Sequence, residues 1–286
     1  MTSDWTVQHK TVLVTGGNTG IGLETAAALA GKGAEVVLTS RDAAKGDAAV
    51  ATIKERFPDA NVTAMELDLS RLSDVRRFAS EFASRYPKLH VLVNNAGLML
   101  SDRAVTEDGY EQTFQVNHLG PFLLTNLLFP NLQAAAPSRI INVASAAHRG
   151  GRLNFDDLHT ERGYRGMSVY GTSKLCNILF TRELARRLEG TGVTANSLHP
   201  GTVRTGFGRD GDTRGLFAIG VKLGGIFFKS PAQGARTTIH LATSPDVDET
   251  TGEYFVNSKI SKPARAATND DDARRLWDMS EELVGL

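Results

Sequence analysis

The chain has 286 residues, of which 41% are hydrophobic and 22% are charged, an ordinary composition for a globular protein. Its 32 basic residues balance 32 acidic ones, which indicates neither a nucleic-acid surface nor an acidic tail. Cys176 is the only cysteine, which excludes an internal disulfide and argues against a cysteine-based metal site. No signal peptide is visible, and the longest apolar tract (215–228) is shorter than the ~20 residues of a spanning helix, so we expect a soluble, cytoplasmic protein.

Short runs of β-branched residues alternate with longer stretches of helical spacing. This pattern predicts strands at 11–15, 34–40, 62–67, 89–94, 139–144 and 193–198, and first helices at 20–32 and 42–57. Asp42 is the expected N-cap of the second helix. Strands that are separated by helix-length segments predict right-handed crossovers and a mostly parallel sheet covered on both faces. Because no repeat or linker divides the chain, residues 1–286 are expected to form one doubly wound α/β domain.

The first turn between strand and helix is rich in glycine. Glycine permits a tight turn and lets backbone N–H groups approach a pyrophosphate at the start of the helix. A purely structural turn is the alternative, but a position in the first strand–helix unit is what a Rossmann-type dinucleotide loop requires. The residues expected to bind the cofactor here are Gly16, Asn18, Thr19, Gly20, Ile21 and Gly22.

The end of the second strand, Ser40-Arg41-Asp42, distinguishes between the two nicotinamide dinucleotides. Enzymes that use NAD usually carry an acidic residue here, which binds the ribose 2′-hydroxyl. Arg41 could instead hold a 2′-phosphate through two hydrogen bonds, with Asn18 and Thr19 as nearby donors. Because the helix cap accounts for Asp42, the sequence favours NADP, with NAD as the alternative.

Two later turns place polar or small residues at the carboxyl ends of strands, where ligands bind in open α/β sheets. Asp68-Leu69 follows the third strand; its carboxylate could accept a hydrogen bond from the adenine amino group or could cap the next helix. The fourth strand is followed by Asn94-Asn95-Ala96-Gly97. We expect Asp68, Leu69, Asn95, Ala96 and Gly97 to lie beside the cofactor.

Tyr170 and Lys174 are four residues apart, which places them on the same face of a helix. Lowering the pKa of a phenol from ~10 to 7 requires roughly 4 kcal/mol of preference for the phenolate. A cation at about 4 Å supplies energy on the order of 4 kcal/mol at an effective dielectric constant of ~20. The pair could therefore exchange a proton near neutral pH, although an exposed tyrosine beside a solvated lysine is the simpler explanation of this motif alone.

Taken together, these residues resemble the short-chain dehydrogenase/reductase family. The resemblance extends from about Lys10 to the C-terminus, with the motifs in the family's order and approximate spacing. The stretches 116–125, 180–188, 197–205 and 275–277 are similar to the retinol dehydrogenase and aldehyde reductase branch. The motifs that carry the resemblance are Gly16/Gly20/Gly22, Asn94–Gly97, Asn117, Ser145, Tyr170/Lys174 and Pro200–Gly201.

The resemblance implies four catalytic residues. Tyr170 would be the general acid/base, and Ser145 would orient the substrate oxygen. Lys174 would hold the nicotinamide ribose and lower the pKa of Tyr170, while Asn117 would position a water that links Lys174 to solvent. The resemblance also implies cofactor contacts from Pro200, Gly201, Val203 and Thr205.

The stretch 206–230 mixes apolar residues with glycine, and its counterpart in the family covers the substrate. We expect a small helical lid over an apolar substrate, with Phe207 and Phe227 as substrate contacts; an ordinary packed helix and an interfacial membrane contact are the alternatives. None of the histidines has a second ligand at metal-binding spacing, so no metal site is expected, and His148 is assigned to the substrate pocket. The stretch 270–284 predicts an amphipathic helix that packs against the lid.

The sequence therefore predicts an NADP(H)-dependent oxidoreductase that interconverts an apolar alcohol and its aldehyde or ketone. The alternatives are a sensor that binds NADP(H) without turnover, an NAD-dependent dehydrogenase, and an enone reductase of the same family. The partners expected are a small substrate and a second copy of the chain, paired through the helices that carry Asn117 and Tyr170. Membrane-bound members carry an apolar N-terminal anchor, which this sequence lacks, so a lipid-dissolved retinoid is not the expected natural substrate.

Overall fold

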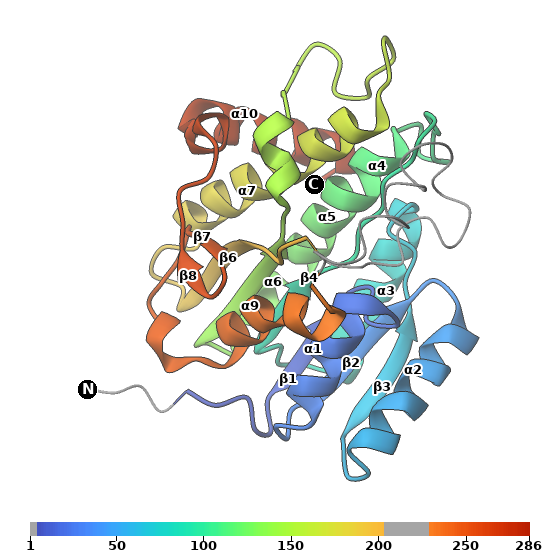
Figure 1. The fold of residues 1–286 in the computed structure, drawn as a ribbon, viewed down its shortest axis with the longest axis vertical. Helices are drawn as coiled ribbons and strands as arrows, with labels where there is room; N and C mark the ends of the chain where they lie inside the picture. The colour runs from blue at the N-terminus through green and yellow to red at the C-terminus, as the bar shows by residue number, and fades with distance from the viewer. Residues whose placement is uncertain (1–4, 203–228) are drawn as a thin grey trace.

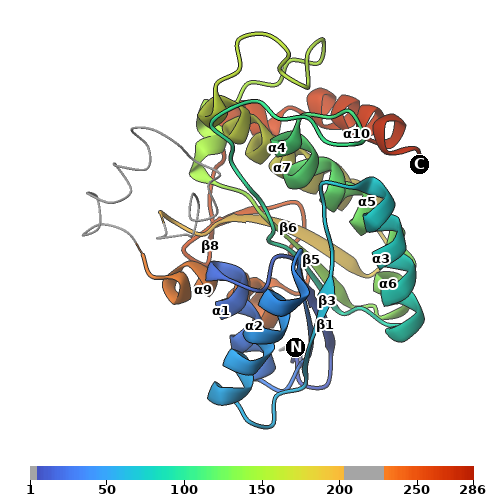
Figure 2. The ribbon, with the colours of Figure 1, turned by 90° about the vertical axis from the view of Figure 1, so that its right-hand side faces the viewer.

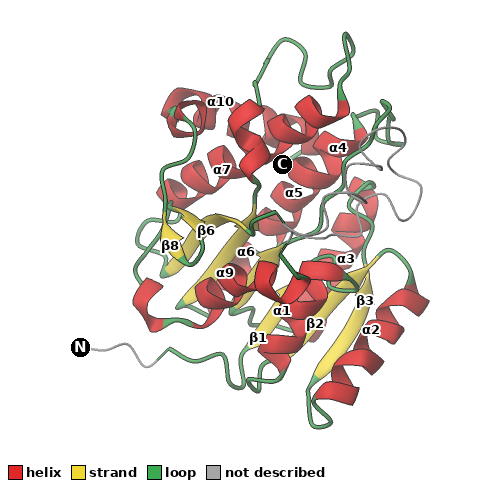
Figure 3. Ribbon diagram, viewed as in Figure 1, coloured by secondary structure: helices red, strands yellow, loops and turns green. Residues whose placement is uncertain are grey.

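The computed structural model describes residues 5–202 and 229–286, whose strands form one central sheet (Figures 1 and 3). The order across the sheet is β3-β2-β1-β4-β5-β6-β7-β8. Neighbouring strands from β3 to β7 pair in parallel, and β8 pairs antiparallel with β7 at one edge. The strands are β1 (Thr11–Val14), β2 (Glu35–Ser40), β3 (Val62–Glu66), β4 (Val91–Asn94), β5 (Ser138–Val143), β6 (Val193–His199), β7 (Tyr254–Val256) and β8 (Lys259–Ile260).

The strand order reverses direction at β1, which pairs with β2 on one side and with β4 on the other. In the register of the sheet, Val12 of β1 lies between Val36 of β2 and Val91 of β4. Such a switch point creates a crevice beyond the carboxyl ends of the strands, where ligands bind in open α/β sheets. The fold therefore brings the predicted site residues to one edge of the sheet.

Helices cover both faces of the sheet (Figure 2). One face carries α1 (Gly20–Ala30), α2 (Ala43–Arg56) and α9 (Pro231–Thr243). The other carries α3 (Leu72–Arg85), α5 (Gly120–Leu127), α6 (Phe129–Ala134) and α7 (Gly166–Arg187). Each face has its own apolar core, so all four residues of β1 are buried and apolar residues need not alternate with polar ones along the strand.

Shorter elements lie between the main helices and strands and include a π-helical turn. A π-helix is rare and often marks a functional site. The shorter elements are α4 (Gln112–Phe114), the π-helix η1 (Gln115–Leu119), and the 3₁₀-helices η2 (Ala146–Gly150), η3 (Pro245–Val247) and η4 (Arg265–Thr268).

The predicted fold class is confirmed, and the six predicted strands agree with β1–β6 to within two residues at each end. Asp42 caps α2 as expected, because its side chain accepts a hydrogen bond from the backbone N–H of Lys45 at 3.1 Å. The strands β7 and β8 were not predicted. They contain three and two residues, too few for a period-two pattern to be recognised.

The C-terminal helix α10 (Asp270–Val284) covers the outer face of α7 and α5. Its Trp277 ring lies 4.9 Å from the ring of Phe122 in α5 and 5.8 Å from that of Phe180 in α7, between centroids. The predicted helix is confirmed, but its described contacts are with these helices, whereas the lid stretch 206–230 lies almost wholly outside the described residues. The helices that carry Asn117 and Tyr170, which were expected to pair with a second copy, both contact α10 of the same chain, and the pairing itself remains a prediction.

Within the described ranges, no helix has the length and apolar character needed to cross a membrane.

Replacing Trp277 tests whether α10 is an integral part of the core. We expect Trp277→Ala to lower the free energy of unfolding by about 3–5 kcal/mol, because Trp277 is buried against two phenylalanines. Urea unfolding followed by circular dichroism measures this change. The control, Leu286→Ala at a 53% exposed position, should change it by no more than ~0.5 kcal/mol. Equal effects of the two substitutions would contradict a packed α10.

Candidate active site

The glycine-rich turn lies at the switch point, between β1 and α1. Gly20 has a φ of +57°, and an added Cβ there would meet no atom within 4 Å, so the turn is open on that side. Gly22 is required for a different reason, since an added Cβ would lie 2.3 Å from the Gly16 carbonyl oxygen and 2.5 Å from Asn95 Nδ2. The start of α1 therefore approaches the turn closely while its outer side stays accessible.

The N-terminus of α1 presents backbone N–H groups beside this turn. Thr19 is the N-cap residue, but its side chain makes no capping hydrogen bond, and the first turn of α1 contains no acidic residue. The first N–H groups of a helix have no intrahelical acceptors, and the helix dipole favours an anion there. Together with partly exposed Asn18 and buried Ile21, these residues fit the pyrophosphate of a nicotinamide dinucleotide.

Thr15 and Asn95 connect the glycine-rich turn to the segment after β4. Thr15 Oγ1 accepts hydrogen bonds from the backbone N–H groups of Asn95 and Ala96, at 3.0 and 3.1 Å. The Asn95 amide in turn donates to the carbonyl oxygens of Thr15 and Gly16, at 2.8 and 3.2 Å. Asn95 thus positions the turn. Thr15 was not predicted as part of the site, although its place at the end of the first strand was a usable signal.

The residues after β2 leave Arg41 accessible to a ligand. Ser40 is buried and accepts a hydrogen bond from the Asp42 N–H at 3.2 Å, while the Asp42 carboxylate caps α2. Arg41 is exposed and makes no hydrogen bond or ion pair with any residue in 5–202 or 229–286. Asp42, the acidic residue that could have indicated NAD, therefore serves as the N-cap of α2. The Arg41 guanidinium has no partner among residues 5–202 and 229–286.

Asp68 forms a local turn at the end of β3. Its Oδ1 accepts hydrogen bonds from Ser70 N at 2.9 Å and Ser70 Oγ at 2.6 Å. The N-cap of α3 is Arg71, so Asp68 is not the helix cap that was the alternative explanation. Leu69 is buried against Gly120 at the start of α5. Contacts of Asp68 and Leu69 with an adenine remain predictions.

Asn117 is fully buried in the π-helix η1. Its Oδ1 accepts a hydrogen bond from Leu98 N at 2.8 Å. Its Nδ2 donates to Leu98 O at 2.8 Å and to Ser173 Oγ at 2.9 Å. The side chain therefore joins the segment after β4 to α7, and the water-positioning role implied by the resemblance remains a prediction.

Lys174 is 3% exposed and lies in the interior beside Asn117. An added Cβ on Gly97 would lie 3.1 Å from Asn117 Oδ1 and 3.2 Å from Lys174 Nζ, so the structure brings these three residues together. The ammonium donates to the Val143 carbonyl oxygen at 3.0 Å, and burial lowers the pKa of Lys174 to about 8. At neutral pH this buried group is mostly protonated, and two of its N–H bonds have no acceptor in the part of the chain that the structure describes.

Tyr170 and Ser145 meet at the carboxyl end of β5. Ser145 Oγ accepts a hydrogen bond from Ala147 N at 3.2 Å, and the Ser145 hydroxyl also interacts with the phenol of Tyr170. Burial raises the pKa of Tyr170, and the contact with Ser145 lowers it in part. The Lys174 ammonium lies 5.6 Å from the centroid of the Tyr170 ring.

Burial is the largest influence on the pKa of Tyr170, so the lowering expected from Lys174 remains a prediction. Removing the phenol from water penalises its anion, and this penalty is the dominant effect on the pKa. The group that offsets it is the Ser145 hydroxyl.

His148 does not have the geometry of a substrate contact. Its side chain is fully buried, and both of its ring nitrogens lie within hydrogen-bonding distance of backbone groups, those of Ser145 and Ala264. Its assignment to the substrate pocket is therefore not supported. The spacing of residues placed it near Ser145, but it could not show which way the ring points.

Pro200 and Gly201 follow β6 at the same edge of the sheet, and Lys229 packs against them. An added Cβ on Gly201 would lie 2.8 Å from Lys229 Nζ, and the ammonium donates to Asn257 Oδ1 at 2.7 Å. Lys229 was not predicted from the sequence, because nothing in its local sequence relates it to Gly201. The other predicted contacts Val203, Thr205, Phe207 and Phe227 lie outside the described residues.

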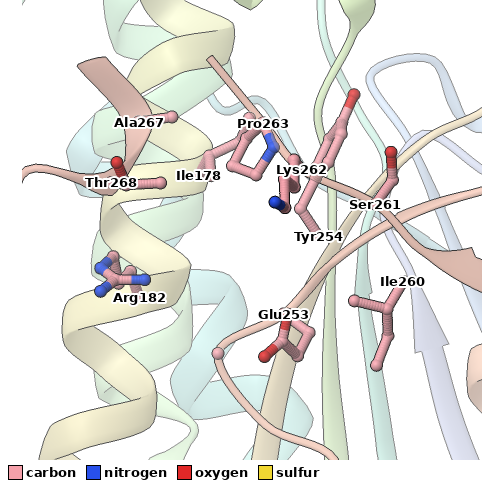
Figure 4. A pocket seen from close by; sticks show the side chains of 11 residues that line it. Ile178, Arg182, Glu253, Tyr254, Ile260, Ser261, Lys262, Pro263, Ala267 and Thr268 are labelled. Carbon is pink, nitrogen blue, oxygen red and sulfur yellow. The ribbon is translucent and has the colours of Figure 1, made fainter. Parts of the chain in front are cut away.

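A cavity of about 400 Å³ lies farther along α7, between Ile178, Arg182 and the segment 252–268 (Figure 4). Apolar Ile260 and Pro263 line it together with the charged side chains of Glu253 and Lys262. No residue assigned to catalysis by sequence lines this cavity. Among the described residues, no cluster of three histidine, cysteine, aspartate or glutamate side chains could hold a metal ion.

Comparison with known proteins identifies the family. A family model described as short chain dehydrogenase matches residues 10–213. The chain belongs to the short-chain dehydrogenase family. Within this family it is 46% identical to mouse retinol dehydrogenase 14, over 97% of this chain and 86% of that protein. It is 45% identical to human retinol dehydrogenase 13, over 98% of this chain and 86% of that protein.

Solved structures of short-chain dehydrogenases and related proteins share the fold. An uncharacterized protein of Mycobacterium paratuberculosis is 35% identical and superposes with a TM-score of 0.80, covering 99% of this chain and 96% of its own. The NADP complex of RhlG from Pseudomonas aeruginosa is 26% identical with a TM-score of 0.70, covering 87% of this chain and 95% of its own. The chain is thus a member of the retinol dehydrogenase-like branch of an oxidoreductase family that uses nicotinamide cofactors.

The buried ammonium leads to a prediction about stability. Because burial lowers the pKa of Lys174 from 10.5 to about 8, its charged form, although still the main form at pH 7, is less stable in the folded protein than in the unfolded chain. We expect Lys174→Met, which keeps the side-chain volume, to raise the free energy of unfolding by about 1–3 kcal/mol while abolishing turnover. Urea unfolding at pH 7 measures the change. A loss of stability would show that hydrogen bonding of the ammonium outweighs the cost of its burial.

Proposed function

We propose that the protein is an NADP(H)-dependent oxidoreductase that interconverts an apolar alcohol and its aldehyde or ketone, with Tyr170 as the proton donor and acceptor. The observation that carries the proposal is the contact between the Tyr170 phenol and the Ser145 hydroxyl, one helical turn from the buried ammonium of Lys174. A phenol that exchanges a proton, a hydroxyl that orients the reacting oxygen and a cation are the groups that carbonyl reduction requires from a protein.

Each of these side chains has a separate task. Ser145 would hold the substrate oxygen next to the Tyr170 hydroxyl, which donates its proton in reduction and accepts one in oxidation. The Lys174 ammonium, whose remaining N–H bonds point to no described acceptor, would bind the ribose hydroxyls of the cofactor and favour the phenolate. The cofactor, when bound, supplies or accepts the hydride.

The two residues that follow β2 support NADP as the cofactor over NAD. Arg41 is exposed and unpaired within the described ranges, and the neighbouring acid Asp42 is used as a helix cap. A guanidinium suits a 2′-phosphate because it can donate two parallel hydrogen bonds to it. The similarity to the NADP complex of RhlG supports the same choice.

The names of the similar proteins support an apolar alcohol as the substrate. Proteins named retinol dehydrogenase are 42–46% identical to this chain, and retinol is an apolar primary alcohol. We extend the proposal to retinol-like and other apolar alcohols and aldehydes. The single, buried cysteine suits a reducing compartment such as the cytoplasm.

A sensor that binds NADP(H) without turnover is the second candidate function. A sensor does not need a proton donor in contact with an orienting hydroxyl, and both groups are present here. Hydride transfer from NADPH to a panel of apolar aldehydes, including retinal, separates the two candidates. An absence of turnover across the panel, with NADPH binding intact, would favour the sensor.

Tyr170→Phe tests the proton transfer directly. We expect kcat to fall by about 10²–10⁴-fold, because the general acid/base is lost, while the Kd for NADPH stays the same. Steady-state kinetics and fluorescence titration of NADPH measure the two quantities. The matched control is Tyr164→Phe, which removes a phenol that contacts Leu100 and Glu111 and should leave kcat within about threefold. Retained turnover in folded Tyr170→Phe would refute the mechanism.

Arg41→Ala tests the choice of cofactor. We expect the KM for NADP to rise by about 10–100-fold and the KM for NAD to change little, because a charged hydrogen bond contributes about 1.5–3 kcal/mol. The control Arg56→Ala removes the same charge from the far end of α2 and should affect neither constant. Tighter use of NAD than of NADP by the unmodified protein would overturn the assignment.

A further inference from the structure

The peptide bond that follows Ser145 lies between two histidine rings. On one side, the Ser145 carbonyl oxygen lies 2.6 Å from Nδ1 of His148 and also accepts a hydrogen bond from the His148 backbone N–H at 3.1 Å. On the other side, the N–H of Ala146 donates to Nδ1 of His199 at 3.1 Å. Both polar groups of this one peptide are therefore held by imidazole nitrogens that come from different elements, η2 and β6.

The hydrogen bonds fix opposite tautomers for the two rings. The N–H of Ala264 donates to Nε2 of His148 at 3.0 Å, so Nε2 carries no proton and Nδ1–H is the donor to Ser145. His199 accepts at Nδ1, so the proton of its neutral ring is on Nε2.

Burial keeps both rings neutral. His148 is fully buried, and its ring packs edge to face on Tyr254 with centroids 5.1 Å apart. Burial lowers the pKa of His148, and it lowers that of His199 to about 4 with further contributions from Lys229, His148 and Arg149. At neutral pH each ring therefore keeps the single donor or acceptor that its peptide contact requires.

The held peptide determines where the Ser145 hydroxyl lies. Ser145 has an extended backbone (φ −156°, ψ 156°), and its Oγ accepts from Ala147 N at 3.2 Å. Rotating the Ser145–Ala146 peptide about ψ would move Ala147 away from that oxygen. It would also change the contact of the Ser145 hydroxyl with Tyr170, the contact that lowers the pKa of the phenol.

We propose that His148 and His199 are positioning residues, which fix the Ser145–Ala146 peptide and thereby hold the Ser145 hydroxyl against Tyr170. The inference rests on the proposed function for its kinetic consequences. Neither ring needs to touch the substrate, and His148 has no exposed surface with which to do so. The simpler alternative is that both rings only fill space beneath the site.

A matched pair of variants at position 148 tests the proposal. Asparagine can place an N–H near the position of Nδ1, whereas glutamine places its amide near Nε2 and leaves the Ser145 carbonyl without the ring donor. We expect His148→Asn to keep kcat within about threefold, and His148→Gln to lower it by roughly 10–100-fold with little change in the KM for NADPH. We also expect the pKa that governs kcat to rise in His148→Gln, because the Ser145 hydroxyl no longer lowers that of Tyr170. Equal kcat values and pH profiles for the two variants would overturn the proposal.

A double-mutant cycle shows whether His148 acts through Ser145. In a Ser145→Ala background the hydroxyl is absent, so His148→Gln should cause no further loss of kcat. If His148→Gln lowers kcat by the same factor in the Ser145→Ala background as in the wild type, then His148 acts independently of Ser145. That result would reject the positioning role. Thermal unfolding of every variant identifies effects that come from stability alone.

The tautomers can be tested without turnover. In ¹⁵N spectra of the histidine-labelled wild-type protein, we expect a proton on Nδ1 of His148 and on Nε2 of His199. The reverse assignment for either ring would refute the proposal even if the enzyme is fully active. Because this measurement uses no substrate, it distinguishes failure of this inference from failure of the proposed function.

Discussion

The buried ammonium of Lys174 is the constraint on which the arrangement of the site depends. A charged group in the interior needs polar partners and enough space around it. The Val143 carbonyl supplies one partner at 3.0 Å, and Gly97 leaves the space, since a Cβ there would lie 3.2 Å from the nitrogen. Asn117 Oδ1 lies on the same side, 3.1 Å from that Cβ position, and is held there by the bonds of Asn117 to Leu98 and Ser173. The end of β5, the turn after β4 and the π-helix thus meet near this one charged group.

The second requirement is that the glycine-rich turn and the catalytic residues keep a fixed relation. The turn follows β1 and Ser145 follows β5, with β4 between the two strands, and hydrogen bonds of Thr15 and Asn95 join the turn to the segment after β4. Hydrogen bonds are directional, so they hold backbone groups more precisely in orientation than dispersion contacts do. A cofactor that spans the switch point would meet a binding turn and a reaction site already in register.

Much of this architecture was predictable from sequence, because its signals are local. The buried β-branched runs indicated β1–β6, and the preference of aspartate for N-cap positions indicated Asp42. The four residues proposed for catalysis were predicted from their order along the chain, and the structure brings Asn117, Ser145, Tyr170 and Lys174 to one edge of the sheet.

The features that sequence did not reveal depend on tertiary contacts. The pKa of Tyr170 is dominated by burial, which no spacing of residues reports. His148 lies near Ser145 as expected, yet its ring points to backbone groups, because Ala264, more than one hundred residues later, supplies a donor for it. The π-helix at Gln115–Leu119 has no recognised sequence signature, and Lys229 reaches Gly201 only in the folded chain.

The position of α10 has a consequence for how the protein is made. The ribosome synthesises α10 after every helix that α10 covers, so Phe122 and Phe180 emerge long before Trp277 exists to shield them. Until that helix leaves the exit tunnel, the nascent chain presents an aromatic surface next to its future reaction centre.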